Sequence, residues 1–224
     1  MRVVLIGLGG IGSHLAEPMS RILAYTEHSA LNHIILIDGD SYKKENRTRQ
    51  RFEFSSNKAQ ATKDKLTVLF PELKIEAKPL FITDDNIYIF IREGDVVLLA
   101  VDNHATRKLV SNHVGTLENV LLISGGNDLH DGNIQVYERK NGEDIHTPLT
   151  KFHPEIETPQ DKNPSELTCE EVAQTGSPQL LTVNFMIAGL LLNAFTLWIQ
   201  DGKIPYNEQY FDLRTGNIRS VKRS

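Results

Sequence analysis

The chain has 224 residues, 40% of them hydrophobic, which is enough for a single α/β domain with a substantial core. The net charge of −5 excludes a globally basic surface for nucleic acid, and the single cysteine excludes both a disulfide framework and a cysteine-rich zinc site. No charged-then-apolar leader precedes the first apolar run, so we expect no signal peptide, a cytoplasmic location and no zinc.

A strand, a glycine-rich turn and a helix are predicted at the start of the chain. Residues 3–6 are apolar, and the sequence GLGGIG follows from residue 7 to residue 12. Gly7, Gly9 and Gly12 keep the G-x-G-x-x-G spacing, and Gly10 lies in the same turn. A helix is expected over 11–24. Its N-terminal N–H groups and the glycine backbone suit a phosphate group.

The second predicted strand, over 34–38, ends in an acidic residue. Asp38 stands where nucleotide-binding α/β folds place an acid that accepts hydrogen bonds from ribose hydroxyls. The polar loop 39–55 then carries Asp40, Asn46, Arg49 and Gln50. Alone, this stretch is equally consistent with a solvated charged loop. Together with the glycine turn, it predicts a mononucleotide or dinucleotide site.

Helices and strands alternate through the middle of the chain, as is typical of a mostly parallel sheet. Helices are expected over 58–69, 83–92 and 104–117. Strands are expected over 74–79, 95–100 and 120–124, with Gly125 and Gly126 ending the last of them. The buried strand 95–100 leads directly to Asp102, which could cap the following helix. Residues 132–138 alternate as an antiparallel strand, and Asn141-Gly142 forms a turn.

A different kind of segment follows. Residues 143–166 contain prolines and acids without periodicity, which predicts a long, mobile surface loop leading to Cys169. The apolar stretch 180–199 is long enough to span a membrane, but polar residues interrupt it, so we expect a helix in the core or in a subunit interface. A strand pair is expected over 210–219. We expect one domain over 1–224, with a crossover loop at about 143–168.

The combined motifs resemble the ThiF/MoeB/HesA family, relatives of the ubiquitin-activating enzymes. The matching positions are GLGGIG, IDGD, N-x-x-RQ, Lys58, VDN at 101–103, LTC at 167–169 and FDLRTGNI near the end. The resemblance covers nearly the whole chain, and the part after Ile145 is most similar to stand-alone bacterial ThiF-like proteins. It implies a Rossmann-like ThiF/MoeB-type fold, a mostly parallel sheet with an antiparallel extension and flanking helices.

The family also implies a reaction, namely ATP–Mg²⁺-dependent adenylation of the C-terminal carboxylate of a ubiquitin-like or sulfur-carrier protein. On this resemblance, Arg49 and Lys58 bind phosphates, Asn46 and Gln50 orient oxygens, and Asp102 holds Mg²⁺. Asp38 would bind the ribose, and Asp40 would help position the loop or the metal. Lys63 and Lys65 compete with Lys58, but only Lys58 keeps the family's spacing to Leu66 and Pro71.

Three further expectations follow from the resemblance. Cys169 is either the acceptor of the activated partner or a structural residue. Glu170 and Glu171 would raise the pKa of its thiol, which disfavours the acceptor role. Members of the family form homodimers, and some accompany conjugating-enzyme-like proteins. Many bacterial members add an arginine from a helix before the first strand. Here Arg21 or Arg51 would substitute for it, a partner would supply it, or activity would be weaker.

Two other functions remain open at this point. One is a dehydratase of the same family that acts on RNA, which the acidic composition disfavours. The other is an NAD(P)-binding oxidoreductase or a nucleotide-binding scaffold without turnover. A dehydrogenase needs neither a phosphate-binding arginine nor a Mg²⁺ acid, so Arg49, Lys58 and Asp102 favour adenylation. Neither a membrane nor a nucleic acid is an expected partner.

Overall fold

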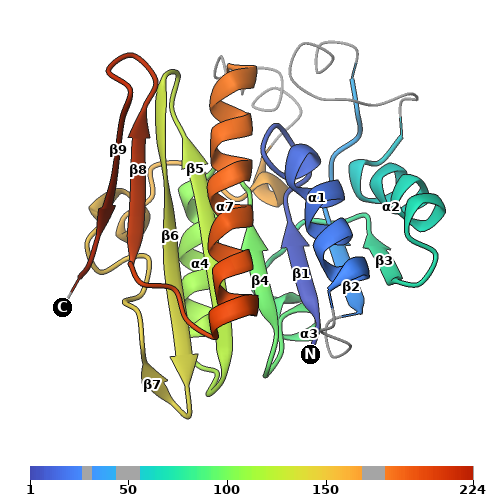
Figure 1. Ribbon diagram of the computed structural model, residues 1–224, viewed down its shortest axis with the longest axis horizontal. Coiled ribbons are helices and arrows are strands. Elements are labelled where there is room, and N and C mark those ends of the chain that lie inside the picture. The colour runs from blue at the N-terminus through green and yellow to red at the C-terminus, as the bar shows by residue number, and fades with distance from the viewer. Residues whose placement is uncertain (27–31, 44–55, 168–179, 224) are drawn as a thin grey trace.

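In the computed structural model, the protein folds around a single nine-stranded sheet with helices on both faces (Figure 1). The structure describes residues 1–26, 32–43, 56–167 and 180–223. The strand order is β3-β2-β1-β4-β5-β6-β8-β9, and β7 pairs with β6 beside this path. The predicted mixed α/β fold, mostly parallel with an antiparallel extension, is confirmed.

The parallel half of the sheet consists of five strands whose side chains are mostly apolar. These strands are β1 Val3–Ile6, β2 His33–Ile37, β3 Lys74–Lys78, β4 Val96–Leu99 and β5 Val120–Asn127. Every residue of β1 and β4 is buried, because helices cover both faces of the sheet there. β1 lies in the centre, paired with β2 and β4, so the turn after it is flanked by the ends of both neighbours.

The antiparallel half consists of β6 Asp131–Lys140, β7 Glu143–Asp144, β8 Glu208–Asp212 and β9 Asn217–Val221. The expected turn between β6 and β7 is confirmed, with positive φ at Asn141 and Gly142. The strand pair around Thr215-Gly216 is also confirmed.

Helices divide between the two faces of the sheet. On one face lie α1 Gly12–Tyr25, α2 Lys58–Leu69 and α7 Leu181–Asp201, in front of the sheet in Figure 1. On the other lie α3 Ile87–Phe90, α4 His104–Val114 and α5 Pro154–Glu157. Alternate residues of one strand enter opposite cores, as Leu5 and Ile6 do.

The helix α7 is the one helix in the described residues that is long and apolar enough to cross a membrane by length and composition. In this fold 44% of the most apolar 18-residue stretch of α7 is buried, and the helix packs against α1, β5 and β6. Gly125 and Gly132 allow this close contact, since a Cβ on either would fall 2.5 Å or 2.7 Å from Ile187. The helix therefore serves as a core element, as predicted.

Three expected boundaries are wrong. The helix expected over 104–117 ends at Val114, with Gly115 as its C-cap. β5 does not break at Gly125 and Gly126 but continues to Asn127, because its pairing with β6 extends to Gly132 and the two glycines make room for side chains above the strand. The helix expected over 83–92 shrinks to the four residues of α3, since Asn86 and the Thr83 backbone form a capped turn before it.

The segment 143–167 is not structureless. It contains β7, α5 and the 3₁₀ turn η3 Pro164–Glu166, and it buries Leu149 and Ile156 against α4 and the strands beneath. The apolar residues of this proline-rich stretch gave no periodic pattern, yet Leu149 and Ile156 each fill one position in the core, whereas Ile145 and Phe152 are exposed. The mobility expected for this segment stays a prediction.

Candidate functional site

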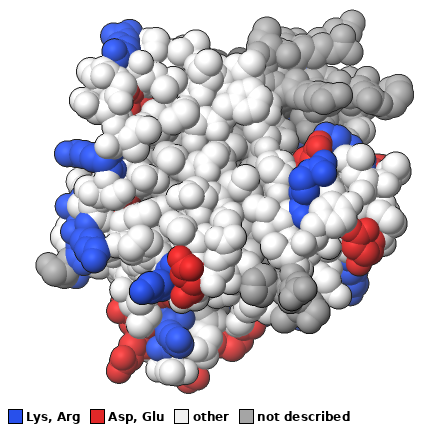
Figure 2. Space-filling view, viewed as in Figure 1, with Lys and Arg blue, Asp and Glu red and all other residues white. Residues whose placement is uncertain are grey.

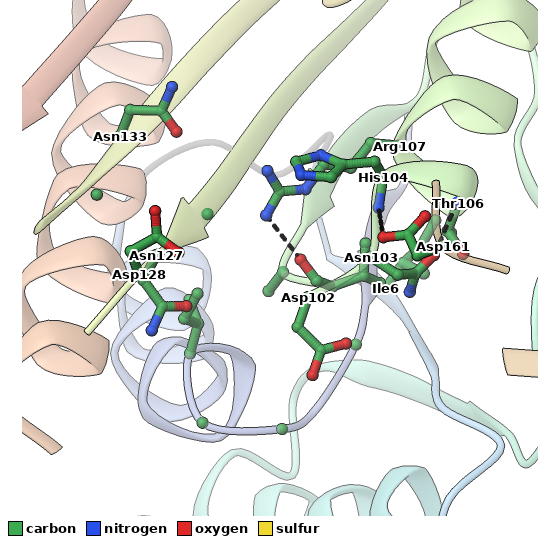
Figure 3. Close-up of a pocket in the computed structure, with 18 of the residues that line it drawn as sticks. Ile6, Asp102, Asn103, His104, Thr106, Arg107, Asn127, Asp128, Asn133 and Asp161 are labelled. Atoms are coloured by element: carbon green, nitrogen blue, oxygen red, sulfur yellow. Dashed lines mark hydrogen bonds between the residues drawn. The ribbon is translucent and has the colours of Figure 1, made fainter. Parts of the chain in front are cut away.

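A large cleft runs along the carboxyl ends of β1, β2 and β4 and on towards β6, β8 and β9 (Figure 3). Its volume is about 1990 Å³. Small-molecule sites usually occupy about 300–1,000 Å³, so this cleft can hold a nucleotide together with an extended chain segment. Its position at the carboxyl ends of parallel strands is where open α/β sheets bind ligands.

The glycine turn forms one end of the cleft. Gly7 has φ +87°, and a Cβ there would lie 2.7 Å from the Ala100 carbonyl oxygen. A Cβ on Gly12 would overlap the Gly7 carbonyl group. Gly7, Gly9 and Gly10 line the cleft, and Ile11 at the start of α1 supplies no side-chain cap. The Ser13 and His14 N–H groups already donate to the Gly9 and Ile11 carbonyl oxygens at 3.1 Å, so the backbone of the glycine turn itself is the part that can receive an anion.

Asp38 joins the glycine turn to the end of β2. One carboxylate oxygen accepts the Leu8 N–H at 2.6 Å, and the other accepts the Asp40 N–H at 2.8 Å. Burial raises the pKa of Asp38, while Lys58 and the two N–H groups oppose this rise. Asp38 lines the cleft, so the ribose contact expected of it is compatible with its place and stays a prediction.

Lys58 and Asp40 lie beside this turn as an ion pair. The Lys58 Nζ is 2.9 Å from the Asp40 carboxylate, and the Lys58 N–H donates to the Asp40 carbonyl oxygen at 2.8 Å. Lys58 is 8% exposed, although it is a lysine, and both residues line the cleft. Neither Lys63 nor Lys65 lines the cleft; Lys65 pairs with Glu17 instead. Lys58 is thus the lysine of α2 that can reach a phosphate.

Asn57 is a residue that sequence reasoning missed. Its side chain caps α2 by accepting the Gln60 N–H, and it donates to the carbonyl oxygens of Asp38 and Asp40 at 2.8 and 3.0 Å. The signal was present, since an asparagine directly before a predicted helix is a frequent N-cap. By holding both acidic residues, Asn57 fixes the geometry of this end of the cleft.

Asp102 lies on the cleft after β4 with its side chain exposed. The helix-cap alternative for it is wrong, because the neighbouring Asn103 caps α4 by accepting the Thr106 N–H at 2.8 Å. Figure 3 shows the Asp102 carboxylate turned towards the glycine turn. The described residues contain no cluster of three or more metal-ligating side chains. A single accessible carboxylate still suits Mg²⁺ when phosphates and water complete the coordination.

Several predicted site residues lie outside the described residues. These are Asn46, Arg49, Gln50 and Cys169, and also Arg51. Arg21, the other proposed substitute cation, lies on α1, where it packs over the Phe70 ring and pairs with Glu17. It does not line the cleft of its own chain.

Arg107 and Asp161 were also missed. Arg107, on α4, is 6% exposed and lines the cleft, and its Nη2 donates to the carbonyl oxygens of Val101 and Gly125. The Asp161 carboxylate accepts the first two N–H groups of α4, at His104 and Ala105. Neither could be assigned from sequence, because the partners of each lie many positions away along the chain.

Residues 1–223 match the model of the ThiF family. The chain belongs to this family. It is 31% identical over 144 residues to the adenylyltransferase and sulfurtransferase MOCS3 of Drosophila sechellia, covering 62% of this chain and 30% of that protein. It is 28% identical over 139 residues to a sulfur carrier protein adenylyltransferase of Thermus thermophilus, covering 60% of this chain and 48% of the relative.

Solved structures agree on the fold. The structure of Escherichia coli MccB with ATP superposes with a TM-score of 0.73 at 20% identity, covering 99% of this chain and 63% of that one. PaaA superposes with a TM-score of 0.71 at 17% identity, with the same coverage. The ThiF-type, Rossmann-like fold implied by the motifs is therefore confirmed.

Proposed function

We propose that this ThiF-family protein is an enzyme that uses ATP and Mg²⁺ to adenylate the C-terminal carboxylate of a ubiquitin-like or sulfur-carrier protein. The observation that carries the proposal is one cleft that joins a glycine turn, a buried lysine and an accessible aspartate. Those three features are Gly7–Gly12, Lys58 and Asp102. The names of the similar adenylyltransferases support the same reaction over NAD(P)-dependent redox chemistry.

The reaction joins an oxygen of the partner's terminal carboxylate to the α-phosphorus of ATP. The bond from that phosphorus to the oxygen bridging the β-phosphorus breaks, and pyrophosphate leaves with its electron pair. No proton has to move, because the carboxylate is already ionised. Since both reactants are anions, the protein must supply positive charge and fixed N–H donors where they meet.

Residues of this chain meet that requirement in distinct ways. The glycine turn offers backbone N–H groups to the phosphates, and Lys58 adds a positive charge beside them. Asp102 would hold Mg²⁺, which neutralises phosphate charge when bound. We assign the ribose to Asp38, loop or metal positioning to Asp40, and further phosphate and oxygen contacts to Arg49, Asn46 and Gln50.

Calorimetry tests the nucleotide assignment. Wild-type protein is titrated with ATP–Mg²⁺ and separately with NAD, and we expect binding of ATP only. Exchange of labelled pyrophosphate into ATP, measured with candidate ubiquitin-like proteins from neighbouring genes, then tests the adenylation step. Tight NAD binding with no ATP binding would overturn the proposal.

A second step, transfer of the activated partner to Cys169, is part of the proposal as one of two alternatives. If Cys169 accepts the acyl group, Cys169→Ala keeps partner-dependent pyrophosphate exchange but loses a thiol-sensitive adduct seen by intact mass. If Cys169 is structural, the alanine variant completes the whole reaction. Absence of an adduct in wild type would leave the protein an adenylating enzyme only.

We further propose a cytoplasmic homodimer that uses the outer face of α7, with a conjugating-enzyme-like protein as an additional partner. Figure 2 shows an uncharged surface over most of the length of α7, which ends at the exposed Asp201. Leu181 and Phe185 are exposed there, and Phe185 stacks on His14 of α1 with ring centroids 4.0 Å apart. Light scattering of the wild type and of Phe185→Glu tests this face, and a monomeric wild type would contradict it.

A further inference from the structure

Arg107 is a buried cation beneath the floor of the cleft. Its Nη2 donates to the carbonyl oxygens of Val101 at 2.9 Å and Gly125 at 3.1 Å, which fixes the guanidinium between β4 and β5. Its Nε–H has no hydrogen-bond partner among the described residues. Figure 3 shows the guanidinium facing the cavity it shares with Asn127, Asp128 and Asn133.

The backbone of β5 is adapted to this guanidinium. A Cβ on Gly126 would lie 2.6 Å from the Arg107 Cζ and closer still to both terminal nitrogens. Only glycine at this place lets the guanidinium lie against the strand. The side chain is therefore held in place from the strand side, and it can meet a ligand only on the side of the cleft.

The charge of Arg107 is not neutralised by an ion pair among the described residues, where no carboxylate lies within 4.0 Å of it. Burial lowers the pKa of Arg107, and the more distant carboxylates of Asp102, Asp161, Glu155 and Asp128 oppose this. Asp102 is turned away in Figure 3, and Asp161 is occupied by the N-terminus of α4. A buried cation without a counter-ion is costly, so an anion is expected to complete the site.

We propose that Arg107 is a catalytic residue that binds the attacking carboxylate of the partner's C-terminus and afterwards the acyl carbonyl oxygen of the adenylate. This inference rests on the proposed function and deepens it. The carboxylate fits because the guanidinium can donate a charge-assisted hydrogen bond through Nη1, while Nη2 stays bonded to the carbonyl oxygens of Val101 and Gly125. The cleft continues past Arg107 between Asn127 and Asn133, which leaves room for the rest of an extended tail.

Asn127 supports the same assignment from the opposite side of the cavity. Its side-chain Nδ2 donates to the side-chain Oδ1 of Asn184 on α7 at 3.3 Å, and Asn184 is fully buried. This bond orients Asn127 towards the cleft. A positioned amide opposite a guanidinium gives the tail carboxylate and its preceding peptide group distinct donors and acceptors.

The test compares AMP with an acyl-adenylate analogue in which a sulfamoyl group replaces the phosphate and carries the acyl group, and each probe is compared between wild type and variant. AMP reports on the nucleotide end alone, whereas 5′-O-[N-(acetylglycyl)sulfamoyl]adenosine adds the acyl carbonyl oxygen that Arg107 would hold. Calorimetry measures both on wild type, Arg107→Met and Arg107→Lys. We expect Arg107→Met to weaken the acyl probe at least tenfold and AMP less than twofold, with partial recovery in Arg107→Lys.

Two more variants keep the test decisive. Lys108→Met removes a positive charge from the same helix, where Lys108 only donates to the Glu157 carbonyl oxygen, and should change neither probe. Gly126→Ala keeps the charge but displaces the guanidinium, so it should reproduce the selective loss even if Arg107→Met does not fold. Equal weakening of both probes, or no weakening of the acyl probe, would overturn the role of Arg107. Failure of wild type to bind ATP–Mg²⁺ would instead overturn the proposed function and this inference with it.

Discussion

The two ends of the cleft treat charge differently. At the glycine-turn end, the charged side chains already have partners, since Asp38 accepts two N–H groups and Lys58 pairs with Asp40. At the far end, Arg107 is buried, and its Nε–H has no hydrogen-bond partner within the part of the chain that the structure describes. The first end is thus organised before any ligand binds, whereas the second is completed by its ligand. A nucleotide site can be formed in advance, whereas the site for the partner's C-terminal tail gains its anion only when the tail binds.

Asp102 lies between the two ends, and removing it should have the largest effect. We expect Asp102→Ala to reduce partner-dependent pyrophosphate exchange about 10³-fold, because the metal carboxylate is lost. The melting temperature should stay unchanged, since the side chain is exposed and does not cap α4. Asp85→Ala removes an exposed carboxylate that does not line the cleft and serves as a matched control. Wild-type exchange in folded Asp102→Ala would remove Asp102 from the mechanism.

The rigidity of the glycine-turn end can be measured by Gly12→Ala. Its Cβ would overlap the Gly7 carbonyl, so we expect the free energy of unfolding to fall by about 2–4 kcal/mol in urea titrations. Gly189→Ala is the matched control, because nothing lies within 4 Å of a Cβ there. On the exposed face of α7 it should stabilise the protein by about 0.5–1 kcal/mol. Equal stability of the two variants would show that the turn tolerates a side chain.

A smaller effect, on binding alone, is expected from Lys58→Met. Loss of one charge-assisted contact to phosphate should weaken ATP–Mg²⁺ binding about tenfold. Lys65→Met, on the same helix but paired with Glu17 away from the cleft, should bind ATP as wild type does. Calorimetry on both variants decides between the two lysines, and a reversed result would show that the family spacing misassigned the phosphate lysine.

The smallest effect is expected away from both ends. On β3, hydrogen bonds from Lys78, Lys74 and His33 lower the pKa of Glu76 to about 2. A lowered pKa means that this contribution to stability is present above pH 4.5 and is lost as the pH falls towards 2. Glu76→Gln should therefore lower stability by less than about 1 kcal/mol at pH 7, and the difference should vanish in acid. Thermal melts between pH 2 and pH 7 check this, and a pH-independent difference would contradict it.

The sequence was informative where local chemistry decides the structure. Continuous apolar runs predicted β1, β2 and β4, and α2 begins at Lys58 and ends at Leu69 as expected. Prediction from the sequence failed where contacts between distant segments determine the structure. β5 passes through Gly125 because α7 covers it.

The same reasoning applies to the site. Asp38 was identified because it ends a predicted strand, and Lys58 and Asp102 were identified through the family resemblance. The structure brings all three to one cleft. In the sequence, Arg107 resembles any charged residue of an amphipathic helix. Its burial depends on Gly126 in β5. Asp161 caps a helix that begins 57 positions earlier in the chain. Contacts between residues so far apart in the chain cannot be recognised from the local sequence pattern.

The strand order also determines when each part of the protein can form during synthesis. β1 pairs with β2 and with β4, so the central strand has both neighbours once residue 99 has been made. β6 must wait for β8, which starts at Glu208. Until then the growing chain presents an open strand edge to other chains. The glycine turn can therefore assemble early, and the β6 edge is the surface most exposed to aggregation before β8 arrives.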